Sequence, residues 1–140
     1  MDRLDAHPAM VDPVAEWITR HWQESFEEVR QMLLDDSNCP PTLVAVREDE
    51  PIGVLAYKCH PPAGLDKEEL WINVLYVTPS WRHHGIGSRL VREGITRAAD
   101  HGHPRLFVFT DLPQFYERLG WQRFSFNEAK QMHLLNIHIP

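Results

Sequence analysis

A short segment with two glycines contains residue types that can bind phosphate. Residues 82–88 read RHHGIGS, and a helical pattern begins at Gly85. Because glycine has no Cβ atom, a ligand can approach this backbone closely and the turn can adopt unusual angles. The first amide groups of a helix have no partner within it, and the helix dipole favours negative charge near them. With Arg82 as a fixed cation beside it, the segment is a candidate cradle for a pyrophosphate.

Two familiar nucleotide motifs do not fit this segment. The P-loop needs Lys and then Ser or Thr after its last glycine, whereas Gly87 is followed by Ser88 and Arg89. A dinucleotide fingerprint would need a third glycine where Arg89 or Leu90 stands. Taken alone, the pattern Arg-x-x-Gly-x-Gly also suits a glycine-rich turn that only caps a helix. The segment by itself leaves both interpretations open.

The surrounding patterns predict a mixed α/β sheet with helices on its faces. Helices are predicted from apolar residues at helical spacing, over 10–21, 26–33, 85–101 and 113–119. Strands are predicted at 3–6, 42–47, 52–58, 69–77, 106–110, 121–126 and 132–139. Ser25 and Glu28 form a capping pattern for the second helix, a break follows over 35–41, and Gly102 ends the third helix. The strands at 42–47 and 52–58 form a hairpin.

Length and composition indicate one soluble domain, residues 1–140. The chain is 43% apolar and 24% charged, ordinary values for a globular protein. No apolar run reaches the roughly 18 residues of a membrane span, and the N-terminus has no secretory pattern. Cys39 and Cys59 are therefore expected to be thiols in a reducing cytoplasm. The net charge of −6 argues against nucleic acid as a partner, and we expect no membrane partner.

Two motifs resemble those of one enzyme superfamily. Residues 74–90, VLYVTPSWRHHGIGSRL, resemble the coenzyme-A-binding motif of the GNAT N-acetyltransferases, and residues 115–121, FYERLGW, resemble their second signature. The resemblance covers nearly the whole chain, because the predicted element order also matches. It implies the GNAT fold, a mostly antiparallel sheet of six to seven strands with about four helices. It also implies acetyl-CoA as the cosubstrate.

The resemblance implies how the cosubstrate is held. The pyrophosphate would bind the amides of the glycine segment, and the pantetheine arm would pair with the end of the third long strand, where two parallel strands part. A backbone N–H of that strand would polarise the acetyl carbonyl. The implied cofactor-binding residues are Leu75, Tyr76, Val77, Arg82, His83, His84, Gly85, Ile86, Gly87 and Ser88.

The implied reaction is direct attack by an amine on the thioester, and it needs an acid and a base. Tyr116 matches the family position whose phenol protonates the leaving thiolate, although an aromatic on a short helix can also simply pack in the core. The base is harder to assign, because Trp71 stands where members often carry an acid. Glu69 is one step earlier on the same strand face if the side chains alternate without a break. It is the candidate base, through a water that Asn73 holds, or it is a solvent-facing charge.

The remaining polar residues receive weaker predictions. Asp111 either recognises the acceptor or cofactor or, more simply, caps the helix at 113–119. Trp17, Trp22 and Trp71 either wall the acceptor site or pack in the core. Neither of the two histidine pairs, His83–His84 and His101–His103, has carboxylate or cysteine companions at metal spacing, so we expect no metal.

Charge is unevenly distributed along the chain. Residues 1–70 carry a net −9 and residues 71–140 a net +3. This asymmetry can steer a cationic acceptor and a polyanionic cofactor to different sides of one cleft, although solvated faces would give the same counts.

The sequence therefore predicts an acetyl-CoA-dependent N-acetyltransferase that acts on the primary amine of a small molecule or peptide. The alternatives are a protein N-terminal or lysine acetyltransferase and a non-catalytic CoA-binding regulatory module of the same fold. A sheet edge at 132–139 is a candidate surface for a homodimer, and the sequence leaves the oligomeric state open.

Overall fold

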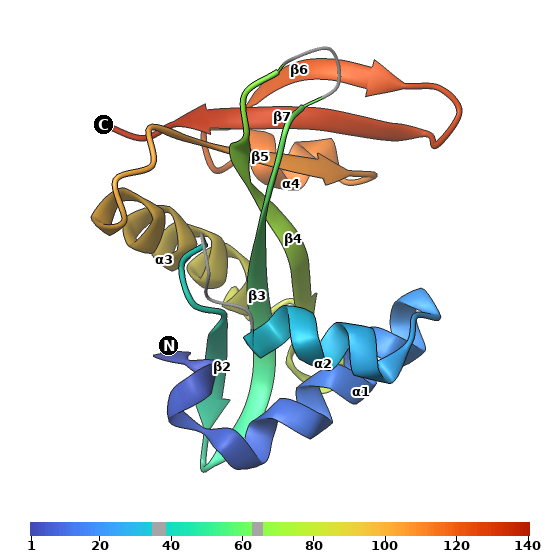
Figure 1. Ribbon diagram of the computed structural model, residues 1–140, viewed down its shortest axis with the longest axis vertical. Helices are drawn as coiled ribbons and strands as arrows, with labels where there is room; N and C mark the ends of the chain where they lie inside the picture. The colour runs from blue at the N-terminus through green and yellow to red at the C-terminus, as the bar shows by residue number, and fades with distance from the viewer. Residues whose placement is uncertain (35–38, 63–65) are drawn as a thin grey trace.

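The predicted helices and strands form a seven-stranded sheet with helices on both faces (Figure 1). The structure is a computed structural model, and it describes residues 1–34, 39–62 and 66–140. The strands are β1 Asp2–Arg3, β2 Leu43–Arg47, β3 Glu50–His60, β4 Glu69–Val77, β5 Arg105–Thr110, β6 Gln122–Asn127 and β7 Met132–His138. The α-helices are α1 Val11–Trp22, α2 Phe26–Leu34, α3 Ile86–Asp100 and α4 Pro113–Glu117. Short 3-10 turns cover Leu4–Ala6, Pro8–Met10 and Pro79–Trp81. The GNAT-type sheet expected from the sequence is confirmed.

Local sequence explains where the helices begin and end. The Ser25 hydroxyl accepts the Glu28 N–H at 3.5 Å, which is the cap predicted for α2. Gly102, with a φ of 79°, follows α3, as predicted for a helix stop. Of the break predicted over 35–41, residues 35–38 lie outside the described part of the chain.

The two faces of the sheet bury two separate clusters. On one face α3 packs Leu90 and Val91 against Leu55 of β3. On the other face α1 and α2 cover the neighbouring residue Val54, with Ile18 among the side chains that cover it. The residues Val54 and Leu55 face opposite ways because strand side chains alternate. The helix layers therefore lie on opposite sides of β3.

The strand order is β1-β2-β3-β4-β5-β7-β6, and only β4 and β5 are parallel. Their pairing runs from Leu70–Leu106 to Ile72–Val108 and includes no later residue of β4. Figure 1 shows the two strands turning away from one another beyond this point. The last part of β4 therefore lacks a strand on its β5 side.

A bulge in β4 changes which side chains share a face. Ala56 pairs with Val74 and Tyr57 pairs with Ile72, so Asn73 is an extra residue between them. On the α1–α2 face of the sheet lie Trp71 before the bulge and Val74 and Tyr76 after it. On the α3 face lie Leu70 and Ile72 before the bulge and Leu75 and Val77 after it. Glu69 and Trp71 lie before the bulge, so the unbroken alternation on which their shared face was predicted ends at Asn73 and does not extend to Leu75 and Val77.

The predicted sheet edge at 132–139 is also wrong. β7 pairs with β5 on one side and with β6 on the other, so its backbone groups are used within the sheet. Within the described residues, β6 is the edge strand at this end, and all of it is exposed.

None of the helices in the described residues is long and apolar enough to cross a membrane. The sulfur atoms of Cys39 and Cys59 lie 3.0 Å apart in a thiol–thiol contact.

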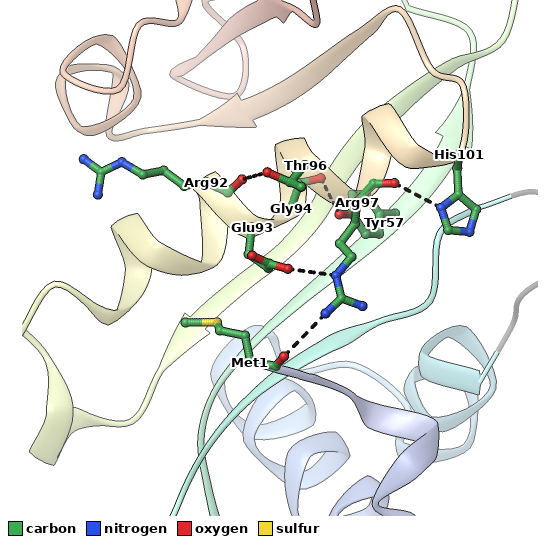
Figure 2. A network of polar contacts seen from close by, with 8 residues as sticks. All are labelled: Met1, Tyr57, Arg92, Glu93, Gly94, Thr96, Arg97 and His101. Carbon is green, nitrogen blue, oxygen red and sulfur yellow. Dashed lines mark hydrogen bonds and ion pairs between the residues drawn. The ribbon is translucent and has the colours of Figure 1, made fainter.

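The position of α3 depends on a close approach at Gly94. The Tyr57 hydroxyl donates to the Gly94 carbonyl at 2.7 Å, as Figure 2 shows. On the same helix Arg97 forms an ion pair with Glu93 at 2.9 Å and reaches the Met1 carbonyl at 3.5 Å. A Cβ atom at Gly94 would lie 3.0 Å from Leu55 Cδ1, and Leu55 is fully buried. The small residue thus lets α3 lie flat on β3.

We expect Gly94→Ala to lower the free energy of unfolding by about 1–2 kcal/mol. The added methyl gains about 1 kcal/mol of helix propensity, but overpacking against a fixed core side chain costs up to about 3 kcal/mol. The measurement is urea unfolding followed by tryptophan fluorescence. Thr96→Ala, at an exposed position of the same helix, is the control and should change stability by less than about 0.5 kcal/mol. A variant more stable than the parent would contradict this account of Gly94.

Candidate active site

A cleft of about 770 Å³ opens where β4 and β5 part. Its lining comes from α1, β3, β4, the turn before α3, the end of β5, α4 and β7. Of the predicted cofactor-binding residues, those that line it are Leu75, Val77, Arg82, His83, Gly85, Ile86, Gly87 and Ser88. Tyr76 and His84 lie outside this lining. The cleft thus brings together the glycine segment and the strand end that the sequence singled out.

The glycine segment has the geometry of an anion site. Gly85 has a φ of 79° at the N-terminus of α3, a left-handed conformation that residues with a Cβ rarely adopt. The first helical bond runs from the Arg89 N–H to the Gly85 carbonyl at 3.1 Å. The amides of Ile86 and Ser88 precede that bond, so they have no carbonyl partner in the helix. Ile86 and Ser88 themselves line the cleft. Their amides and the positive end of the helix dipole therefore lie at its wall.

Arg82 is held in place by β4. Its Nε donates to the Val77 carbonyl at 2.9 Å, and its guanidinium lies 5.3 Å from the ring centre of Tyr76. Tyr76 does not line the cleft itself but contacts Arg82, which does. The centre of the Tyr76 ring lies 5.7 Å from that of Trp17. His84 turns back to the Arg82 carbonyl at 2.8 Å. Arg82 is the cation of the segment that lines the cleft.

Tyr116 combines burial with access to the cleft. The side chain is 5% exposed and also lines the cleft, next to Phe115. The rings of Phe115 and Trp121 lie 5.0 and 5.2 Å from the Tyr116 ring and fix its orientation. Burial raises the pKa of the Tyr116 phenol well above its ordinary value. The hydroxyl is therefore protonated at neutral pH and available as a donor.

Glu69 lies in a different environment from the cleft. It is 8% exposed, and its Oε1 accepts a hydrogen bond from Arg105 Nη2 at 2.8 Å. It is not among the residues that line the cleft, whereas Asn73 and Trp71 are. The indole N–H of Trp71 donates to the His60 carbonyl at 2.7 Å, which fixes the ring. The structure thus separates Glu69 from the water-holding position predicted for Asn73.

Asp111 lines the cleft and does not cap α4. The N-terminal flanking residue of α4 is Leu112, whose N–H is accepted by the Thr110 hydroxyl at 2.9 Å. The capping interpretation of Asp111 is therefore wrong, because the chain turns one residue later than expected. Among the described residues, Asp111 is the only carboxylate in the lining. Among the described residues, no acid of the first half of the chain lines this cleft, so that half contributes no described carboxylate to its wall.

Several lining residues were not predicted as part of a site. Lys58 of β3, Phe109 of β5 and Met132 of β7 come from elements without a motif. Only the sheet order brings these strands next to the gap, and the sequence did not give that order. The sequence left open whether the three tryptophans wall a site or pack in the core. Trp22 and Trp71 line the cleft, and Trp17 does not.

Within the described residues, no group of three or more His, Cys, Asp or Glu side chains could hold a metal ion.

A family model described as the acetyltransferase (GNAT) family matches residues 11–121. The chain belongs to the GNAT acetyltransferase family. It is therefore an acyltransferase by family, and the resemblance of its two motifs is confirmed. No curated protein matched the chain by sequence.

Solved structures of GNAT proteins share this fold. An aminoglycoside 6'-N-acetyltransferase complexed with coenzyme A has a TM-score of 0.77 at 21% identity, over 96% of this chain and 93% of that one. The aminoglycoside 6'-N-acetyltransferase from Enterococcus faecium has a TM-score of 0.76 at 21% identity, over 100% and 95%. The N-acetylglutamate synthase from Neisseria gonorrhoeae, complexed with coenzyme A and N-acetyl-glutamate, has a TM-score of 0.66 at 19% identity, over 93% and 32%. At these identities the likeness establishes the fold.

We expect the free energy of unfolding of this GNAT protein to fall as the pH rises above about 10, the ordinary pKa of a phenol. Burial raises the pKa of both Tyr57 and Tyr116, so the folded state holds these protons more tightly than the unfolded chain does. Their contribution is therefore complete below the unfolded pKa and is lost at higher pH. Urea unfolding at pH 8, 9, 10 and 11 measures the slope. Tyr116→Phe should reduce the slope, and equal slopes for variant and parent would contradict the assignment for Tyr116.

Proposed function

We propose that this GNAT protein transfers an acetyl group from acetyl-CoA to a primary amine by direct attack on the thioester. The observation that carries the proposal is one cleft with an anion-binding helix N-terminus at one part of its lining and a buried, neutral phenol at another. The first binds a pyrophosphate, and the second gives a proton to a leaving thiolate. A coenzyme-A thioester needs both.

The residues of the cleft fit the cosubstrate. The amides at the start of α3 and the Arg82 guanidinium suit the pyrophosphate, since backbone donors and a fixed cation both favour an anion. The part of β4 without a β5 partner, with Leu75 and Val77 in the lining, suits an extended pantetheine arm. Bound acetyl-CoA supplies an activated acetyl carbonyl. The similar aminoglycoside 6'-N-acetyltransferase was crystallised with coenzyme A.

The proton balance assigns the roles of acid and base. The amine nitrogen forms a bond to the acetyl carbon, the carbon–sulfur bond breaks, and Tyr116 protonates the departing sulfur. An alkylamine of pKa about 10 is about one part in a thousand neutral at pH 7, a penalty of roughly 4 kcal/mol. A base that accepts the amine proton therefore contributes to the rate. Tyr116 recovers its own proton from that base through solvent.

We propose Asp111 as this base, acting directly or through one water. It is the carboxylate that lines the cleft among the described residues, and it follows β5 immediately beside the gap. Glu69 was the base proposed from sequence, and its ion pair with Arg105 gives it a second role, the support of β4 against β5. Both carboxylates remain proposals that substitution can separate.

The fold does not select the acceptor. The similar solved structures include aminoglycoside 6'-N-acetyltransferases, named for acceptors that are polycations, and one enzyme complexed with N-acetyl-glutamate, which is an anion. A peptide or protein amine and a non-catalytic CoA-binding module are the competing functions carried from the sequence. The buried, protonated Tyr116 in the cleft supports catalysis over the module. A cytoplasmic location stays a prediction from sequence.

The test of the proposed function separates cofactor binding from turnover. We expect calorimetry to detect acetyl-CoA binding in the micromolar range, Arg82→Ala to weaken it about tenfold, and Arg92→Ala, at an exposed position of α3, to leave it unchanged. Tyr116→Phe should keep that affinity and lower kcat about 100-fold, since a general acid contributes that much. Absence of acetyl-CoA binding by the folded parent would overturn the proposal. Tight binding without turnover of any amine would favour the module.

The test of the base compares two carboxylates. We expect Asp111→Asn to lower kcat/KM at neutral pH by about 10- to 100-fold and to lower stability little, because Asp111 is exposed. Glu69→Gln should instead lower the melting temperature, because it removes the partner of Arg105 near the parallel pairing. Rates and melting curves of both variants decide the matter. A larger rate loss for Glu69→Gln than for Asp111→Asn would return the role of base to Glu69.

A further inference from the structure

Lys58 brings a positive charge to the part of the cleft away from the glycine segment. It lies on β3 opposite Trp71 of β4, and its side chain lines the cleft. Its Nζ lies 5.4 Å from the centre of the Trp71 ring, a cation–π contact that directs the ammonium group over the aromatic surface. Lys58 is nevertheless exposed, so a ligand in the cleft can reach it.

In the part of the chain that the structure describes, the ammonium group of Lys58 has no counter-ion. Across residues 1–34, 39–62 and 66–140, neither its Nζ nor that of Lys130 takes part in an ion pair or hydrogen bond. Lys130 Nζ lies 5.8 Å from the ring centre of Phe109, which also lines the cleft. Loss of water around Lys58, and secondly the charge of Lys130, lower the pKa of Lys58. The ammonium groups of Lys58 and Lys130, neither with a counter-ion among the described residues, therefore lie over the rings of Trp71 and Phe109.

This charge lies too far from the glycine segment to serve the cofactor's pyrophosphate. Arg82 is bound to Val77 at the end of β4, whereas Lys58 is opposite Trp71 near the start of that strand. The stretch from Trp71 to Val77 spans about 20 Å at the usual rise of a strand. The bulge at Asn73 lies between them. Lys58 thus belongs to the end of the cleft where an acceptor would enter.

The same end of the cleft offers little to a polycation. Asp111 is the single carboxylate of the described lining, and the aromatic side chains Trp71 and Phe109 lie beside Lys58 and Lys130. A polyamine would have to bring several charges next to Lys58 with one carboxylate to balance them. Apart from Arg82, which is assigned to the cofactor, the charged side chains of the described lining are Lys58 and Asp111, and an acceptor with one anionic group and one amine matches these two.

We propose that the acceptor is an amine that carries an anionic group on an apolar or aromatic body, and that Lys58 binds that group. Lys58 is then a specificity-determining residue, and Asp111 receives the amine. The inference rests on the proposed function, because it names the class of acceptor for that reaction.

The test uses matched amines that differ in one charge. Glycine, leucine, phenylalanine and lysine are each assayed as the free acid and as the carboxamide, with coenzyme-A thiol release as the readout. Ethanolamine against O-phosphoethanolamine distinguishes a phosphate from a carboxylate, and kanamycin represents a polycation. We expect the anionic member of a pair to have at least about tenfold higher kcat/KM, mainly through KM. Lys58→Gln should remove that preference with little change in kcat for the amides. Lys67→Gln, an exposed lysine outside the lining, is the control.

A second arm does not need turnover. N-acetyl-phenylalanine and its carboxamide are titrated by calorimetry into the parent and into Lys58→Gln, each saturated with coenzyme A. Tighter binding of the acid by the parent, lost in the variant, supports an anion-binding role for Lys58 even if the amine assays fail and the proposed function falls. Equal binding of acid and amide by the parent, or a preference that survives in Lys58→Gln, overturns it. Turnover of kanamycin or of the carboxamides at rates above those of the anionic amines also overturns it and leaves the acetyltransferase function standing.

Discussion

The pairing of β4 with β5 stops after Ile72 and Val108, and the rest of the candidate site depends on that stop. Two parallel strands normally satisfy each other's backbone groups along their whole length. Here the bulge at Asn73 bends β4 as it leaves β5, and a cleft opens in the middle of the sheet. A gap of this kind gives a ligand unpaired strand backbone on one side and side chains from both faces. Fully paired strands would leave no room for an extended arm.

The packing of α3 places the anion site at the mouth of this gap. Cβ atoms at Gly53 and Gly94 would each come within 3.0 Å of a core leucine, so both glycines allow α3 to lie close to β3. A close helix brings its first amides to the end of β4, where Arg82 is tied to the Val77 carbonyl. The phenol of Tyr116 reaches the same cleft from α4, held between two aromatic rings. Core packing and site geometry are therefore one arrangement.

Much of this arrangement could be predicted from the sequence. Apolar periodicity located the four α-helices and the strands to within a few residues, and two local motifs pointed to the glycine segment and to Tyr116, which both line the candidate cleft. What failed depended on long-range structure. A bulge such as that at Asn73 changes the facing of every residue after it, yet it leaves no mark in the alternation of apolar residues. The place of β7 inside the sheet, and of Lys58 beside the gap, follows from strand order, which no local pattern encodes. Asp111 was assigned to a cap because a carboxylate before a helix usually is one.

The bulge at Asn73 also separates β4 into two parts that evolution can change independently. The residues after it, Leu75 and Val77, face α3 and border the path to the anion site. Trp71, before it, faces the opposite side and meets Lys58. A substitution before the bulge, at or near Trp71, can alter contacts with an acceptor without disturbing Leu75 and Val77 after it. One strand thus carries two sets of cleft contacts on opposite faces, so a change in one set need not disturb the other.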